Sequence, residues 1–169
     1  MKPRVMTFKD APKERLLNSE VLASAFNGTV YVGGTDTFDN LYRMYKDCND
    51  SLLLLEDDVI SYDKDLILNS IGSNPDRVIN FNFKRKLGEV KGREFIYLQC
   101  AYLPKDVVAM LAEDRHYIYT HNSYIVRTKQ HDCWIGNLLD RKGIDFLSID
   151  GGIETTFKST LGHDNGNKD

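Results

Sequence analysis

Three consecutive carboxylates, Glu56, Asp57 and Asp58, follow an apolar run at Leu52 to Leu55. Like charges at the end of a buried strand repel each other and lose hydration, so a positive group is expected beside them. Glu56 and Asp58 share one face of an extended segment, and Asp57 points the other way. Carboxylate oxygens suit a divalent cation such as Mg²⁺, which we expect at Glu56 and Asp58. The alternative is that Asp57 or Asp58 caps the next turn while the other carboxylates are solvated.

The segments that must position this triplet alternate between short β-rich runs and helical stripes. Such alternation predicts an α/β fold around a mainly parallel sheet. The run before the triplet is apolar on both faces, as expected of a central strand covered by helices on both sides. Ligands of open α/β sheets bind at the carboxyl ends of the strands, and the triplet lies at such an end.

The sequence predicts strands over residues 4–8, 29–32, 51–55, 77–83, 93–100 and 144–149, with a hairpin turn near 87–88 and a β-rich segment at 116–127. It predicts helices at about 11–26, after 33–34, at 63–72, from 104 and at 133–142. Asp10, Thr35 or Asp36, and Asp63 are the expected caps of the first three helices. We expect one catalytic domain over residues 1–149 and a loose polar tail over 150–169.

Composition limits the classes of protein. The chain has 169 residues, of which 41% are hydrophobic and 28% charged, which is typical of one globular domain. With a net charge of −3, the protein lacks the basic character expected of a protein that coats DNA. The 3 cysteines form no zinc-type pair, and their odd number argues against a disulfide framework. With no apolar leader or membrane-length run either, we expect a cytoplasmic protein.

The stretch LLLLEDDV resembles the DxD-type motif of glycosyltransferases with the GT-A fold, in an EDD form. The two βα units before it resemble the nucleotide-binding half of that fold, and CAYLPKD resembles the stretch after its central hairpin. HDCWIGNLLDRKGIDF looks like the acceptor side, and STLGHDNG matches a late histidine. The resemblance implies a GT-A-like (Rossmann-like) three-layer sandwich with a mainly parallel central sheet and a small antiparallel acceptor portion.

The same resemblance implies a metal-dependent enzyme that uses a nucleotide-sugar donor, with UDP as the expected nucleotide and Mn²⁺ or Mg²⁺ as the cofactor. Asp58 would be the primary metal ligand and His163 a second one, if the tail folds back. Glu56 would contact the ribose or a metal-bound water, and Asp36 would face the uracil or ribose. The alternative for His163 is an exposed position in a disordered tail.

Asp132 is the candidate catalytic base. An acceptor hydroxyl must lose a proton as it attacks the anomeric carbon, and a carboxylate within hydrogen-bond reach can take it. The resemblance places a catalytic Asp or Glu here in inverting members, but His131 stands where those members often have an acidic residue. The choice between inversion and retention is therefore open. Asp132 is also a good N-cap for the helix at 133–142.

Nucleotide contacts are expected from loops at the same sheet edge as the triplet. Thr7, Phe8 and Lys9 end the first strand, and Asn40 and Arg43 lie one turn apart on the second helix. We assign these residues, with Asp57, to the nucleotide-binding set. For Asn40 and Arg43 the alternative is simple surface solvation.

The acceptor is not identified by the sequence. Five basic residues lie between Lys84 and Arg93, which a solvated hairpin explains and an anionic acceptor, including modified DNA, would also use. A glycan or a protein is equally open. The chain is short for a GT-A enzyme, which leaves room for a second subunit, as in a homo-oligomer, to complete the site.

The sequence thus predicts a glycosyltransferase, with two rivals. One is a metal-dependent phosphotransfer or phosphohydrolase domain, in which Asp10 would join the acidic cluster. The other is a non-catalytic module that binds a nucleotide but has no base.

Overall fold

The computed structural model describes residues 1–34, 37–81, 99–113 and 131–155. Its strands are β1 (Lys2–Phe8), β2 (Thr29–Gly33), β3 (Leu52–Glu56), β4 (Val59–Tyr62), β5 (Val78–Asn80), β6 (Cys100–Leu103), β7 (Phe146–Ser148) and β8 (Ile153–Thr155). Its helices are α1 (Lys13–Ala25), α2 (Thr37–Lys46), α3 (Lys64–Ser73), α4 (Lys105–Glu113) and α7 (His131–Arg141).

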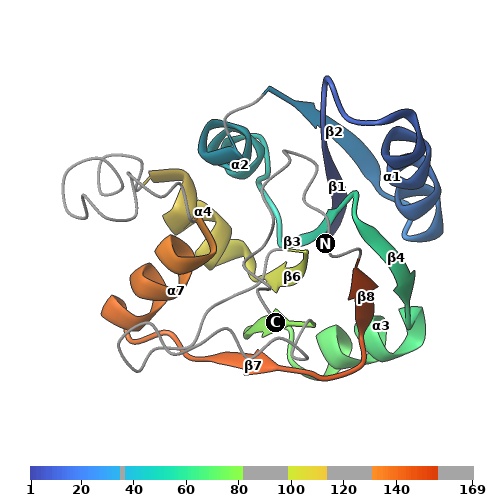
Figure 1. Cartoon of the computed structure of the whole chain (residues 1–169). Coiled ribbons are helices and arrows are strands. Elements are labelled where there is room, and N and C mark those ends of the chain that lie inside the picture. The colour runs from blue at the N-terminus through green and yellow to red at the C-terminus, as the bar shows by residue number, and fades with distance from the viewer. Residues whose placement is uncertain (35–36, 82–98, 114–130, 156–169) are drawn as a thin grey trace, which may run out of the picture.

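Six strands form one sheet in the order β2-β1-β3-β6-β5-β7 (Figure 1). β1 pairs in parallel with β2 and β3, and β5 pairs in parallel with β7. β6 runs antiparallel to both of its neighbours, β3 and β5. The predicted α/β class with a mainly parallel sheet is confirmed, and a small antiparallel sheet of β4 and β8 accompanies it.

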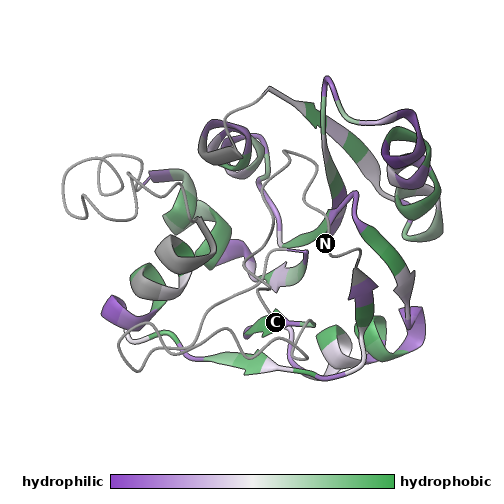
Figure 2. Ribbon diagram, in the orientation of Figure 1, coloured by the Kyte–Doolittle hydropathy of each residue, from purple (hydrophilic) through white to green (hydrophobic). Residues whose placement is uncertain are grey.

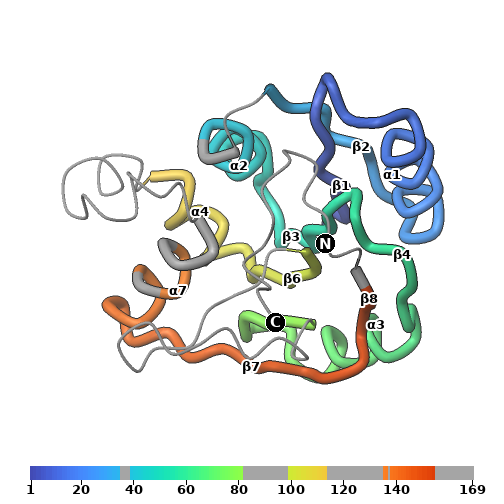
Figure 3. The backbone as a smooth tube through the Cα atoms, in the orientation of Figure 1, coloured from blue at the N-terminus to red at the C-terminus, as the bar shows by residue number. Residues whose placement is uncertain are grey.

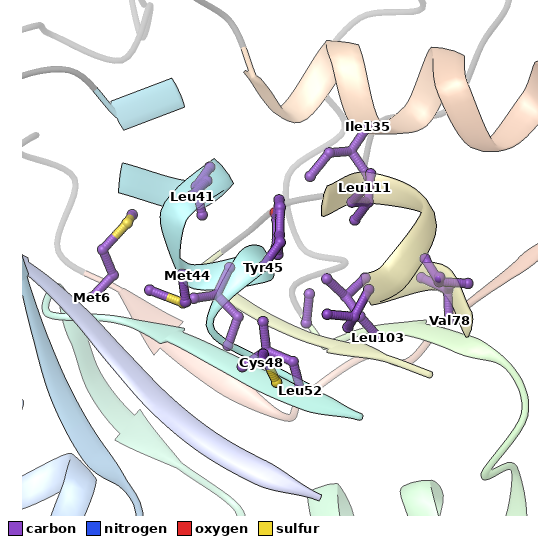
Figure 4. Packing of buried hydrophobic residues seen from close by; sticks show 14 of the residues in the cluster. Met6, Leu41, Met44, Tyr45, Cys48, Leu52, Val78, Leu103, Leu111 and Ile135 are labelled. Atoms are coloured by element: carbon purple, nitrogen blue, oxygen red, sulfur yellow. The ribbon is translucent and has the colours of Figure 1, made fainter. Parts of the chain in front are cut away.

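Helices cover both faces of the large sheet. The central strand β3 has apolar side chains on both sides, and each side packs against helices. Leu52 and Leu54 pack in a cluster with residues of α2, α4 and α7. Leu53 and Leu55 pack in a second cluster with residues of α1, α3, β4 and β8. Figure 4 shows the first cluster, in which side chains from α2, α4 and α7 converge above the strands. Burial of all four leucines confirms β3 as a central strand.

Hydropathy along the helices agrees with this layering. In Figure 2 the middle of α4 is hydrophobic and its ends are hydrophilic. Val107, Val108 and Leu111 are the buried residues of α4, as the sequence predicted. No helix in the four described ranges is both long and apolar enough to cross a membrane.

Three helix ends follow from local chemistry. Asp63 caps α3 as predicted, since its carboxylate accepts a hydrogen bond of 2.9 Å from the Leu66 N–H. Asp10 does not cap α1, because the cap position is Pro12 and no side chain bonds to it. Asn27 after α1 and Gly143 after α7 have positive φ angles of 51° and 66° and end these helices as predicted.

The predicted boundaries fail in two places. The strand predicted over 93–100 begins within the described residues only at Cys100 and continues to Leu103. β4 and β8 were not predicted at all, and β8 lies inside the segment expected to be a loose tail. Figure 3 traces the chain from β3 into β4, beside which β8 returns. Ordered structure therefore continues beyond residue 149. The hairpin near 87–88, the β-rich segment at 116–127 and the proposed cap at Thr35 or Asp36 lie outside the described residues.

Candidate active site at the carboxyl edge of the sheet

The acidic triplet lies where the central strand leaves the sheet. Glu56 is the last residue of β3 and is half-buried, and the turn to β4 holds Asp57 and Asp58. Asp57 is 3% exposed and Asp58 is 6% exposed, so both carboxyl groups lie inside the protein. The alternative raised by the sequence needs one of these two carboxylates to cap the turn and the other to be solvated, and the burial of both does not fit it.

Asp57 is held by two partners from other elements. Its Oδ2 accepts a hydrogen bond of 2.6 Å from the Thr7 hydroxyl of β1. Its Oδ1 forms an ion pair of 3.1 Å with Nη1 of Arg15 on α1. Thr7 is fully buried. Thr7 and Asp57 were both predicted to contact a nucleotide, whereas the structure joins them to each other beneath the turn.

Asn18 of α1 braces the same turn. Its side-chain Nδ2 donates hydrogen bonds of 2.9 Å to the Asp57 carbonyl and 2.8 Å to the Val59 carbonyl. The Asp57 N–H donates to the Met6 carbonyl at 3.1 Å. The first helix and first strand thus fix the backbone on both sides of Asp58. Neither Arg15 nor Asn18 was predicted as a site residue, because nothing in the spacing shows which side of α1 meets this turn.

Gln99 is a further residue of this edge that the sequence did not reveal. The Glu56 N–H donates a hydrogen bond of 2.9 Å to the Gln99 carbonyl, just before β6 begins. β6 is antiparallel to β3, so it starts where β3 ends. Gln99 is 8% exposed. Burial also raises the pKa of the neighbouring Cys100 thiol, which stays protonated and is no nucleophile.

The end of β1 supplies one exposed cation. Phe8 was also predicted to contact the nucleotide, but it belongs to the core cluster and is only 9% exposed. Lys9 is exposed, and its N–H donates to the Gly33 carbonyl at 2.9 Å. Lys9 is therefore the member of the predicted trio best placed to meet a soluble anion.

Asn40 and Arg43 have different roles on α2. The Asn40 amide closes a pair of hydrogen bonds with Gly34, accepting from its N–H at 2.9 Å and donating to its carbonyl at 2.8 Å. Asn40 is 4% exposed, so the surface alternative does not apply to it. The Arg43 side chain is 66% exposed and pairs with Asp39 at 2.8 Å. Asn40 thus shapes the loop after β2, and Arg43 lies on the surface.

For three predicted site residues the structure gives no side-chain contacts. Asp36 and His163 lie outside the described residues. Asp132 is the second residue of α7, so it falls in the first turn of the helix rather than at a cap before it. Only a short loop joins α7 to β7, which runs parallel to β5. A helix packed antiparallel to such a strand begins at the carboxyl edge, so the topology directs the start of α7 toward the edge that holds Glu56.

The donor set fits a hard divalent cation. Glu56 and Asp58 offer carboxylate oxygens, and Mg²⁺ is commonly held by one or two carboxylates together with phosphates and water. Within the described ranges no group of three His, Cys, Asp or Glu residues converges on one point.

Comparisons with known proteins give a likeness of fold. No protein-family model matches the sequence, and no curated protein matches it. Among solved structures, one that matches is the crystal structure of a glycosyltransferase involved in the glycosylation of the major capsid of PBCV-1. The TM-score is 0.52 at 12% sequence identity, over 90% of this chain and 83% of that chain. The chain therefore shares the fold of a glycosyltransferase over most of its length.

Proposed function

We propose that this protein is a GT-A-type glycosyltransferase that moves a sugar from a UDP-sugar to an acceptor hydroxyl with a bound Mn²⁺ or Mg²⁺. The observation that carries the proposal is the position of Glu56 and Asp58 at the carboxyl end of the central strand. The sheet around them has the fold of a glycosyltransferase. That edge is where α/β sheets bind nucleotides.

The charges at the edge support a diphosphate ligand. Arg15 offsets the charge of Asp57 from within the protein. Glu56 and Asp58 would hold the cation, which when bound offsets the negative charge that grows on the departing diphosphate. Lys9, exposed at the end of β1, would add a positive charge for the phosphates.

The reaction needs a base and a fixed donor. The acceptor oxygen forms a bond to the anomeric carbon while the bond from that carbon to the phosphate oxygen breaks and UDP leaves. The acceptor proton passes to the Asp132 carboxylate in an inverting reaction. The bonds from Thr7, Arg15 and Asn18 hold the acidic turn in place, which limits the movement of Glu56 and Asp58 during the reaction.

Release of UDP from a panel of UDP-sugars tests the proposal. With Mn²⁺ present we expect slow release of UDP from at least one sugar, and chelation by EDTA should abolish it. Asp58→Asn should lower the rate by a factor of about 100 or more, the scale of losing one group that stabilises developing charge. Asp65→Asn, an exposed carboxylate in the first turn of α3, is the matched control and should leave the rate unchanged.

The same assay separates the rival functions. Metal-dependent hydrolysis of generic phosphate esters, with no preference for UDP-sugars, would favour a phosphohydrolase. Binding of UDP without any turnover, unchanged by Asp132→Asn, would favour a non-catalytic module. Either result would overturn the proposed transferase.

A further inference from the structure

Gln99 carries a buried acceptor that no described residue uses. Its side-chain Oε1 is buried and accepts no hydrogen bond within the described part of the chain. The whole residue is 8% exposed. A buried amide oxygen left without a donor is unfavourable, and such groups in folded proteins call for a reason. Binding of a ligand at this position would supply the missing donor.

The backbone places Gln99 next to Glu56. The last paired residues of the two strands are Leu55 and Cys100, and the Glu56 N–H bonds to the Gln99 carbonyl at 2.9 Å. Because the strands are antiparallel, the next residue after Leu55 and the residue before Cys100 face each other, so Glu56 lies opposite Gln99. Directly opposed residues of antiparallel strands have neighbouring side chains on one face of the sheet. Leu54 and Ala101, the next pair on that face, both belong to the cluster beneath α2 and α4.

Glu56 and Gln99, whose side chains both end in acceptor oxygens, are therefore neighbours across the two strands. A phosphate oxygen has no proton to offer the Gln99 carbonyl oxygen at neutral pH. A hydroxyl group can donate a proton and suits both oxygens. The pair thus matches the hydroxyl-bearing part of a nucleotide sugar better than its phosphates.

We propose that the Gln99 side-chain oxygen accepts a hydrogen bond from a hydroxyl of the bound nucleotide sugar, beside Glu56, and that this contact contributes to substrate specificity. The inference rests on the proposed function, since it names a residue of that same site. The hydroxyl belongs either to the ribose or to the transferred sugar, and the chemistry of recognition is the same for both.

Gln99→Met tests the inference, because methionine has a similar volume and no oxygen. Replacing an unsatisfied buried amide by an apolar group of the same shape is neutral or stabilising. We therefore expect an unchanged or higher melting temperature. With Mn²⁺ present, the dissociation constant for UDP-glucose should rise about tenfold, which is the scale of losing one hydrogen bond from a site built to make it.

Asn18→Leu is the control for the stability measurement, because the Asn18 amide donates two hydrogen bonds, of 2.9 and 2.8 Å, to backbone carbonyls. That substitution should lower the melting temperature clearly. Titrations with UDP and with 2′-deoxy-UDP locate the hydroxyl. Loss of affinity for UDP-glucose alone assigns it to the transferred sugar, whereas loss for UDP but not for 2′-deoxy-UDP assigns it to the ribose.

Three outcomes would overturn the inference. The first is a fall in melting temperature as large as in the control, which would mean that the Gln99 amide has a structural role. The second is wild-type affinity for UDP-glucose in Gln99→Met, with the proposed function intact. The third is weaker binding of Mn²⁺ alone, which would make Gln99 a metal ligand. Failure of the wild-type protein to bind any UDP-sugar would instead remove the proposed function, and this inference with it.

Discussion

Three adjacent carboxylates at the end of β3 have different environments. Asp57 turns into the protein, where the Thr7 hydroxyl and the Arg15 guanidinium hold its two oxygens. Glu56 lies across from Gln99 on the other face of the sheet. The alternation of a strand separates neighbouring side chains in this way. One acid of the triplet, Asp57, therefore anchors the turn through bonds to β1 and α1.

Substitution of Asp57 should destabilise the protein strongly. Asp57→Ala leaves Arg15, whose side chain is 15% exposed, without the carboxylate that offsets its charge. Removing one partner of a buried ion pair costs about 3–5 kcal/mol. Urea unfolding measures the change, and Arg43→Ala, which removes a side chain that is 66% exposed and its pair with Asp39, should cost no more than about 0.5 kcal/mol. Equal losses in the two variants would show that Asp57 is no anchor.

Two neighbouring glycines after β2 offer a matched pair of substitutions. A Cβ atom on Gly33 would collide with the side chain of Asn40, whereas a Cβ on Gly34 would meet nothing within 4 Å. Gly33→Ala should therefore destabilise the protein by about 1–3 kcal/mol, the usual cost of overpacking. Gly34→Ala should change the free energy of unfolding by less than about 0.5 kcal/mol. Thermal unfolding compares them, and a harmless Gly33→Ala would contradict the described packing of Asn40.

The sequence was sufficient to find the triplet but not its partners. An apolar run followed by three acids is visible in the chain, and so is the alternation that turns Asp57 away from Glu56. Gln99 lies 43 residues beyond Glu56, so only the antiparallel pairing of β3 and β6 reveals that they are neighbours. Thr7 and Asn40 were predicted to contact the ligand because their positions at the sheet edge can be inferred from the sequence. Their hydrogen bonds to Asp57 and Gly34 cannot be inferred in this way, because they depend on the folded arrangement.

At the scale of elements, the small β4–β8 sheet ties the acidic turn to the C-terminal part of the chain. β4 begins at Val59, directly after Asp58, and Val59 pairs with Thr155. The Asp63 N–H also donates to the Gly152 carbonyl at 2.9 Å. Thr155, the last described residue, is thus paired with the residue that follows Asp58. His163 lies outside the described residues, and its role as a metal ligand stays a prediction.

The end of α7 provides a test at this scale. Gly143 has a φ of 66°, a conformation that a side chain disfavours, so Gly143→Ala should cost about 1 kcal/mol or more. Gly72 lies in the last turn of α3, and a Cβ there would meet nothing within 4 Å. Gly72→Ala should raise the free energy of unfolding by up to about 1 kcal/mol, because alanine favours the helix. Chemical denaturation measures the free energy of unfolding of both variants. A change of the same sign in Gly143→Ala and Gly72→Ala would contradict the assigned helix ends.

Long periodic elements were predictable and short strands were not. The apolar stripes of α2, α4 and α7 and the apolar run of β3 give clear signals, and each element is present. β4 reads VISY with two exposed residues, and β8 is the short run Ile153–Thr155 among glycines and polar residues. Such strands are held by pairing across the chain rather than by their own pattern, so tertiary context decides them.

At the scale of the whole molecule, two cores share one sheet. One cluster packs beneath α2, α4 and α7, and the other packs beneath α1 and α3 on the opposite face of the strands. Cys100 belongs to the second cluster and is 0% exposed in the middle of the sheet. Reagents can therefore reach this thiol only when the sheet opens.

Labelling of Cys100 should report global unfolding. Burial raises the pKa of its thiol, so almost no thiolate forms in the folded state at neutral pH. We expect iodoacetamide to leave Cys100 unmodified in the native protein and to modify it fully in concentrated guanidinium chloride, with the site read by peptide mass spectrometry. The labelling rate should rise in Asp57→Ala by about tenfold for each ~1.4 kcal/mol of stability that the variant loses. Rapid native modification would contradict the central position of β6.

The central claim is that the acidic turn holds a divalent cation against the diphosphate of a nucleotide sugar. The most direct measurement is a crystal structure of the protein with Mn²⁺ and UDP, with anomalous scattering recorded for manganese. The account predicts an anomalous peak at about 2.0–2.5 Å from carboxylate oxygens of Asp58 or Glu56, shared with the UDP phosphates. Bound UDP far from β3, or a manganese peak with no contact to either carboxylate, would contradict it.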